Sequence, residues 1–189
     1  MAQRSVLAET PVQRIQLPKV PAGLVLDIGG GGEGLVSRVA ELRVCVVDLN
    51  LSKIREARIY GADAEWLACD GRSLCFGAEV FDTATLWFSL SYLGDQYQKQ
   101  LVIKEIYRVL QGGGKLSILG IVLDESCEAV TFRGQFRFPD GYVSQMSYRV
   151  RGDQLQDCDT MREMLTKEGF EMVSSTDHAH WFEMLAAKL

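Results

Sequence analysis

The chain has 189 residues, of which 47% are hydrophobic and 24% charged, and its formal net charge is −5. This composition is typical of a soluble globular domain, and no apolar run is long enough to cross a bilayer. Lysine and arginine form no basic run, which disfavours a nucleic-acid partner. We therefore expect one domain over residues 1–189, with an N-terminal arm over 1–22 and no membrane attachment.

Short apolar runs alternate with amphipathic segments from about residue 24 to residue 122. Such alternation predicts parallel strands joined by crossover helices. The expected strands are 24–28, 43–49, 64–69, 81–88 and 115–122. The expected helices are 34–42, 51–60, which ends at the natural cap Gly61, and 95–110, which Asp95 can cap and the glycines at 112–114 end.

The stretch 123–159 is predicted to be an insertion that contains a β-hairpin turning at 139–141. Alternation along 130–151 places aromatic and aliphatic side chains on one face, namely those of Val130, Phe132, Phe136, Phe138, Tyr142, Met146 and Tyr148. Two interpretations fit this face. It covers the substrate as a lid or pocket wall, or it packs on its own domain or on a second subunit, which makes the hairpin a candidate homodimer contact.

The C-terminal part predicts one helix and two strands. Thr160 and Glu163 form a capping-box pattern for a short helix that ends at Gly169. Residues 170–175 and 181–189 then have the pattern of strands. Because the polar link between them, 176–180, is short, the two strands should pair as an antiparallel hairpin.

The segment LVLDIGGGGEG joins the first strand to the first helix. Its glycines let the backbone turn sharply and approach a ligand closely, and Gly29, Gly31 and Gly34 fit the dinucleotide pattern G-x-G-x-x-G. Asp48 ends the next strand, where a carboxylate can accept hydrogen bonds from both ribose hydroxyls. The pattern predicts an adenosine-containing cofactor without distinguishing which one.

Two further carboxylates separate the candidate cofactors. Asp27 directly precedes the glycines, where it would repel a pyrophosphate but attract the ammonium group of a methionine moiety. Asp70 follows the third strand, where it can accept from an adenine amino group beside the backbone N–H of Gly71. Both positions favour S-adenosylmethionine over a nicotinamide dinucleotide.

The order and spacing of these motifs resemble those of the class I S-adenosylmethionine-dependent methyltransferases, over about residues 24–189. The matching segments are DIGGGGEG, VVDLN, CDGRSL, FDTATLWF, EIYRVLQGGGKLSI and EGFEMVSS. The resemblance implies a doubly wound, Rossmann-like α/β fold whose seven-stranded sheet is mostly parallel with an antiparallel last strand. It also implies contacts to S-adenosylmethionine from Asp27, Gly29, Gly31, Asp48, Leu49, Asp70, Gly71 and Leu86.

The chain departs from this family in places. Glu33 stands where many members have the third glycine of the loop, with Gly34 one position later, so the helix should begin slightly differently. The fourth strand ends in WFSL instead of the signature of enzymes that methylate adenine or glutamine nitrogen. No acidic pair follows strands four and five to hold magnesium, so we predict no metal.

The acceptor is expected to meet the loops that follow strands four, five and six. Tyr92 in the first of these loops and His178 and His180 in the last are the candidate catalytic residues, since a histidine can take up a proton near neutral pH. Each has a structural alternative, because aromatic residues pack and turn histidines are often solvated. Methyl transfer depends mainly on holding the nucleophile in line with the methyl group and needs no dedicated base.

The sequence therefore predicts S-adenosylmethionine-dependent methyl transfer to a small-molecule acceptor. An NAD(P)-dependent oxidoreductase and a non-catalytic adenosine-cofactor-binding protein are the alternatives, because both share the glycine loop and Asp48. The N-terminal charges and prolines do not resemble a signal peptide, and the five cysteines form no C-x-x-C pair. These two observations favour the cytoplasm as the location.

Overall fold

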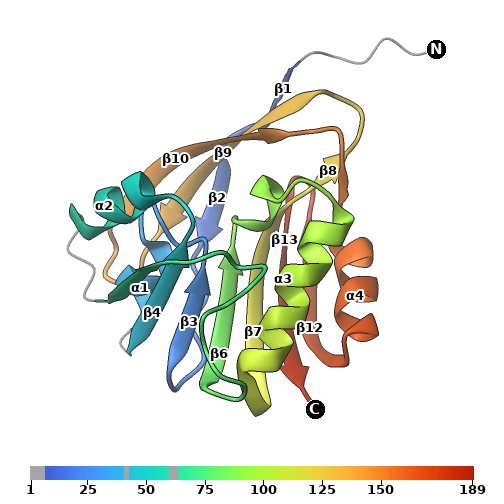
Figure 1. Cartoon of the computed structure of the whole chain (residues 1–189). Helices are drawn as coiled ribbons and strands as arrows, with labels where there is room; N and C mark the ends of the chain where they lie inside the picture. The colour runs from blue at the N-terminus through green and yellow to red at the C-terminus, as the bar shows by residue number, and fades with distance from the viewer. Residues whose placement is uncertain (1–6, 41–42, 60–63) are drawn as a thin grey trace.

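A computed structural model describes residues 7–40, 43–59 and 64–189. Its central sheet has the strand order β12-β13-β7-β6-β3-β4-β5. The strands are β3 (Val25–Ile28), β4 (Val44–Asp48), β5 (Glu65–Ala68), β6 (Phe81–Trp87), β7 (Leu110–Ile121), β12 (Phe170–His178) and β13 (Trp181–Lys188). β3 to β7 pair in parallel, and β13 runs antiparallel to both β7 and β12. The predicted Rossmann-like α/β class is confirmed (Figure 1).

Helices α3 (Gln96–Val109) and α4 (Cys158–Lys167) cover one face of this sheet (Figure 1). Alternate residues of the strands, such as Leu26, Leu86 and Ile118, belong to the same buried cluster as Ile106 of α3 and Met161 of α4. Helix α1 (Leu35–Val39) contributes to a second cluster with Val25 and Val46, on the opposite face. Helix α2 (Leu51–Ile59) contacts β4 and β5 at the edge.

A second, smaller sheet covers much of that opposite face. Strands β9 (Ala129–Arg137) and β10 (Val143–Arg151) form the antiparallel hairpin of the insertion. β1 (Ala8–Glu9) and β2 (Gln13–Gln16) of the N-terminal arm add to β9 in parallel, an extension that the sequence analysis did not predict. The short pair β8 (Leu123–Asp124) and β11 (Leu155–Gln156) closes the base of the insertion.

The aromatic face of the hairpin packs on the central sheet. Phe132 and Phe136 are fully buried, and their ring centroids lie 5.6 and 5.3 Å from that of Phe88 at the end of β6. Phe132 and Phe136 therefore pack on their own domain, as one of the two interpretations of this face predicted. Met146 and Tyr148 of the same face also line a cavity. Tyr142, at the tip of this face, is 51% exposed, and the homodimer contact stays a prediction.

Two helix ends differ from the sequence prediction. Helix α3 ends at Val109 and β7 begins at the next residue, so the glycines at 112–114 lie inside a strand. Phe81 of β6 pairs with Leu110, which precedes the glycines, and Thr83 pairs with Lys115, which follows them. The glycines therefore lie where the register of the two strands shifts. Helix α1 ends at Val39 instead of residue 42. Residues 41–42 and the predicted cap at Gly61 lie outside the described part.

Near the C-terminus the cap and the strand length also differ. Asp157, not Thr160, caps α4: its carboxylate accepts from the backbone N–H of Thr160 at 2.7 Å. Asp157 reaches this amide from the position just before the helix, so Thr160 is free to lie inside it. β12 extends to His178 because its pairing with β13 continues as far as the pair His178–Trp181, which leaves only residues 179–180 for the turn. None of the described helices is long and apolar enough to span a membrane.

The packing of the two sheets is tested by Phe136→Ala. Removing this fully buried ring leaves a cavity between the sheets and should lower the free energy of unfolding by about 3–5 kcal/mol, measured by urea denaturation. Tyr97→Ala is the matched control, because Tyr97 is 70% exposed on α3 and should change stability by less than about 0.5 kcal/mol. Equal effects of the two changes would contradict the assignment of Phe136 to the core.

Candidate functional site

A cavity of about 620 Å³ opens at the carboxyl ends of β3, β4, β5 and β6. Its volume lies in the range of small-molecule sites, and in a doubly wound sheet this edge is where ligands bind. The structure brings every residue predicted to bind the cofactor into its wall: Asp27, Gly29, Gly31, Asp48, Leu49, Asp70, Gly71 and Leu86. Tyr92, a catalytic candidate, lies in the same wall.

The glycine loop is shaped by two close approaches. Gly29 has φ = +74°, and a Cβ there would lie 2.5 Å from the Cβ of Ser89. The backbone N–H of Gly31 donates to Asp48 Oδ2 at 3.0 Å, and a Cβ at this position would lie 2.5 Å from the same oxygen. Both positions therefore require glycine, and the carboxylate that ends β4 holds the loop beside it.

Asp27 is a buried carboxyl with one hydrogen bond. It is 2% exposed, and Thr85 Oγ1 on β6 donates to its Oδ1 at 2.7 Å. Its other oxygen, Oδ2, has no hydrogen-bond partner among the described residues, and neither has the buried hydroxyl of Ser89 in the same cavity wall. Burial raises the pKa of Asp27 to about 7, the Thr85 hydrogen bond opposes this, and the charge of Asp48 adds to it. The cavity thus holds an unpaired acceptor and an unpaired hydroxyl.

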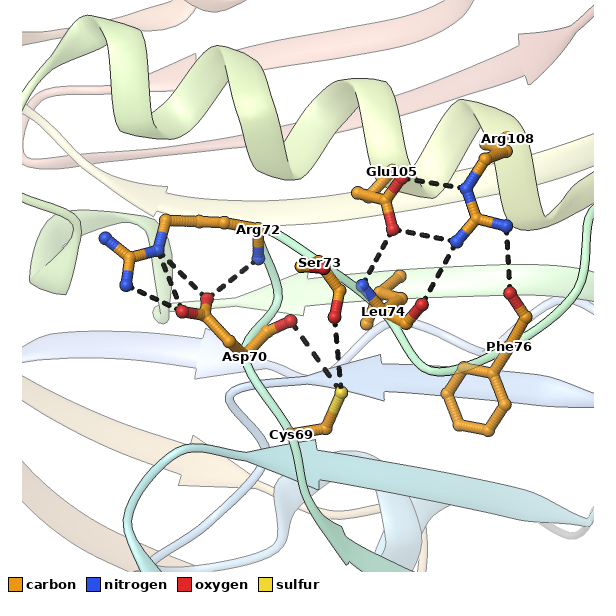
Figure 2. A network of polar contacts seen from close by, with 8 residues as sticks. All are labelled: Cys69, Asp70, Arg72, Ser73, Leu74, Phe76, Glu105 and Arg108. Atoms are coloured by element: carbon orange, nitrogen blue, oxygen red, sulfur yellow. Dashed lines mark hydrogen bonds and ion pairs between the residues drawn. The ribbon is translucent and has the colours of Figure 1, made fainter.

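Asp70 forms an ion pair that the sequence analysis missed. Arg72 donates to it from Nη2 at 2.6 Å, from Nε at 3.0 and 3.1 Å and from its backbone N–H at 2.9 Å (Figure 2). These hydrogen bonds lower the pKa of Asp70 and keep its carboxylate ionised. The Arg72 guanidinium also reaches Gln98 on α3 at 3.2 Å, so the predicted adenine-side carboxylate is oriented from the helix.

The rest of this loop is attached to α3 by a second ion pair. Glu105 accepts from the backbone N–H of Leu74 at 2.7 Å and from Arg108, which donates in turn to the carbonyls of Leu74 and Phe76 (Figure 2). The Arg108 hydrogen bond lowers the pKa of Glu105. The i, i+3 spacing of Glu105 and Arg108 was visible in the sequence, but their loop partners were not.

The opposite wall of the cavity is aromatic and uncharged. Phe88 has φ = +59°, a backbone conformation that is unusual for a bulky residue, and its ring stacks on that of Tyr148 at 5.4 Å with an interplanar angle of 22°. Met146 and Ser147 continue this wall from β10. Among the described lining residues, those of β6, of the short 3-10 helix η1 (Leu90–Tyr92) and of β10 carry no charge.

The two histidines lie away from this cavity. Neither is among its lining residues, and the ring of His178 stacks on Trp181 at 3.9 Å with an interplanar angle of 8°. The turn that holds His180 is at the same edge of the sheet, beside Ile121 of β7, but on the far side of β6 from the glycine loop. Their position removes the geometric support for a catalytic role. Within the described residues, no group of three or more His, Cys, Asp and Glu side chains could hold a metal ion.

Comparison with known proteins agrees with this geometry. Residues 26–118 match a methyltransferase domain family. The ubiquinone/menaquinone biosynthesis C-methyltransferase UbiE of Klebsiella pneumoniae is 29% identical over 176 residues, which cover 79% of this chain and 66% of that protein, slightly less than two thirds of its length.

Solved structures show the same fold. The S-adenosylmethionine-dependent methyltransferase of Methanosarcina mazei superposes with a TM-score of 0.66 at 21% identity, over 88% of this chain and 92% of that one. The N-methyltransferase NodS of Bradyrhizobium japonicum, in complex with S-adenosylhomocysteine, gives 0.62 at 19% identity, over 90% and 79%. Residues 26–118 are thus similar to a methyltransferase domain family, and the fold is that of S-adenosylmethionine-dependent methyltransferases.

The raised pKa of Asp27 predicts a pH-dependent stability of the ligand-free protein. Because the folded-state pKa lies above the ordinary value of 3.8, ionisation of this carboxyl progressively destabilises the fold as pH rises from about 4 to about 7. Asp27→Asn keeps an acceptor for Thr85 and removes the charge. Its gain in Tm over the wild type should be greater at pH 8 than at pH 5 by about 2–4 °C or more, the shift that 1 kcal/mol gives in a chain of this size. A gain independent of pH would contradict the burial of a titrating Asp27.

Proposed function

We propose that this protein transfers the methyl group of S-adenosylmethionine to an uncharged aromatic small molecule in the cavity at the carboxyl ends of β3 to β6. The observation that carries the proposal is the convergence of three carboxylates, Asp27, Asp48 and Asp70, from three strand ends on one cavity whose other wall is aromatic. The match of residues 26–118 to a methyltransferase domain family supports the reaction class.

Each of the three carboxylates would contact a different part of the cofactor. Asp48 retains lone pairs for the ribose hydroxyls beside the bonds it accepts from Gly31 and Asn50. Asp70, held ionised by Arg72, is placed for the adenine amino group. The unpaired Oδ2 of Asp27 and the unpaired hydroxyl of Ser89 complement the ammonium and carboxylate of the methionine moiety. A pyrophosphate would gain nothing from Asp27, which disfavours the oxidoreductase alternative.

The protein contributes orientation more than acid–base chemistry. Bound S-adenosylmethionine supplies an activated methyl group, whose bond to sulfur breaks as its bond to the acceptor forms. Tyr148, whose ring is backed by the buried ring of Phe88, provides a surface on which an acceptor ring can lie with water excluded from that side. Tyr92 is the catalytic candidate that lines the cavity, and we propose that its hydroxyl exchanges a proton with the acceptor. His178 and His180 take no step in this proposal.

The proposed class of methyl acceptor rests on the chemistry of the cavity wall built from β6, η1 and β10. This wall offers aromatic rings, a thioether and a serine hydroxyl but no charge. The name of the Klebsiella pneumoniae relative places that protein in ubiquinone and menaquinone biosynthesis as a C-methyltransferase. We propose a phenol or hydroquinone as the acceptor of this chain. The cytoplasm as location stays a prediction, and the oligomeric state stays open.

Cofactor binding is tested by Asp48→Ala. Loss of charge-assisted hydrogen bonds should weaken the binding of S-adenosylhomocysteine by about 2 kcal/mol, roughly 30-fold, in isothermal titration calorimetry. Glu65→Ala is the control, because this exposed carboxylate lies at the opposite end of neighbouring strand β5. Unchanged affinity in a folded Asp48→Ala protein would contradict the site, and a thermal shift with NAD(H) instead of S-adenosylhomocysteine would favour the oxidoreductase.

The acceptor class is tested by turnover. Wild-type protein with S-adenosylmethionine should release S-adenosylhomocysteine with members of a panel of phenols and hydroquinones and not with aliphatic carboxylates. Tyr148→Ala should lower kcat/KM by about tenfold through loss of the stacked ring. Turnover restricted to charged, non-aromatic acceptors would overturn the acceptor class, and cofactor binding without any turnover would favour the non-catalytic alternative.

A further inference from the structure

Glu33, the residue that stands where the family has a glycine, joins the glycine loop to the hairpin. It lines the cavity, and its Oε2 accepts from Ser144 Oγ on β10 at 3.2 Å and from Arg38 Nη1 on α1 at 3.3 Å. Ser144 is 7% exposed and Glu33 has a side-chain exposure of 21%. This contact connects two segments 111 residues apart in the chain.

Arg38 extends the same junction to the tip of the hairpin. Its guanidinium carbon lies 4.2 Å from the ring centroid of Phe138 and 4.8 Å from that of Tyr142, on either side of the turn. Cation–π contacts of this kind attract when the ring face is within about 6 Å. Glu33 therefore forms an ion pair with Arg38, and the guanidinium of Arg38 packs on two aromatic rings of the hairpin.

The strand attached in this way is β10. It supplies part of the uncharged cavity wall on which the methyl acceptor is proposed to lie, which we call the acceptor wall. Ser144 and Tyr148 lie an even number of residues apart on β10, so they point to the same side, and Met146 lies between them. Met146, Ser147 and Tyr148 line the cavity, and Ser144 is not among the lining residues. Ser144 is therefore two residues along the same strand from Met146, the first of the residues that line this wall.

We propose that Glu33 is a positioning residue that couples the cofactor loop to the acceptor wall. The coupling rests on the proposed function, since the loop that carries Glu33 is the one that contacts the cofactor. A cofactor that orders the loop thereby fixes Glu33, and Glu33 fixes Ser144 and Arg38. The acceptor wall then becomes ordered in response to cofactor binding, and a glycine at this position would not transmit that order.

Hydrogen exchange with mass spectrometry on the full chain tests this without an identified acceptor. Saturating S-adenosylhomocysteine should slow amide exchange in β10 by about tenfold in the wild type. Ser144→Ala should bind S-adenosylhomocysteine with unchanged affinity but lose this effect, and Glu33→Ala should lose it too. Glu33→Gln, which keeps an acceptor for Ser144, should recover part of it. Gln145→Ala, on the opposite and exposed side of β10, should behave as the wild type.

The outcomes separate the coupling from the proposed function. If calorimetry shows no binding of S-adenosylhomocysteine to the wild type, the proposed function fails and the coupling fails with it. Binding without slower exchange in β10 overturns the coupling alone. Retention of the full exchange effect in both Ser144→Ala and Glu33→Ala, with thermal melts that show folded proteins, also overturns it.

Discussion

The burial of the Asp27 carboxyl in the middle of the central sheet is the constraint on which the site depends. A carboxyl there is tolerated because Thr85 on the neighbouring strand donates to one of its oxygens. A side chain at Gly30 would clash with the other oxygen, Oδ2, so the glycines that follow β3 leave room for it. Asp27 thus remains directed at the cavity, at a cost in stability that a bound ammonium group would offset.

The same face of the sheet carries further buried polar groups. Thr83, Thr85 and Ser117 are buried there, and the indole N–H of Trp87 donates to Ser117 at 3.0 Å. The small sheet of β9, β10 and the N-terminal strands lies over this side in place of further helices. The same layer completes the core and supplies Met146, Ser147 and Tyr148 to the wall of the cavity.

Sequence reasoning found the parts of this protein that follow from periodicity and strand ends. The apolar runs gave the strands because buried parallel strands are nearly continuous in hydrophobicity, and Asp27, Asp48 and Asp70 were recognised because each adjoins such a run. The pairing of Arg72 with Asp70 was missed because a two-residue spacing in a loop has no fixed geometry. The strands of the arm were missed because they are short and polar on one side and are stabilised only by pairing with β9. The histidines lie at the same edge of the sheet as the cavity, but they do not line it. Their distance from the glycine loop depends on how many strands lie between them, which local sequence does not show.

The pairing of the N-terminal arm with β9 also affects the order in which the molecule forms. Thr10 accepts from the backbone N–H of Arg133, 123 residues further along the chain, whereas β3, β4 and the glycine loop between them are close in sequence. Closing so long a loop costs entropy before any contact compensates for it, so distant pairings tend to form late. On a ribosome the arm leaves the exit tunnel before its partner β9 has been synthesised. The nascent chain can therefore assemble the glycine loop between β3 and β4 well before the layer that closes over it.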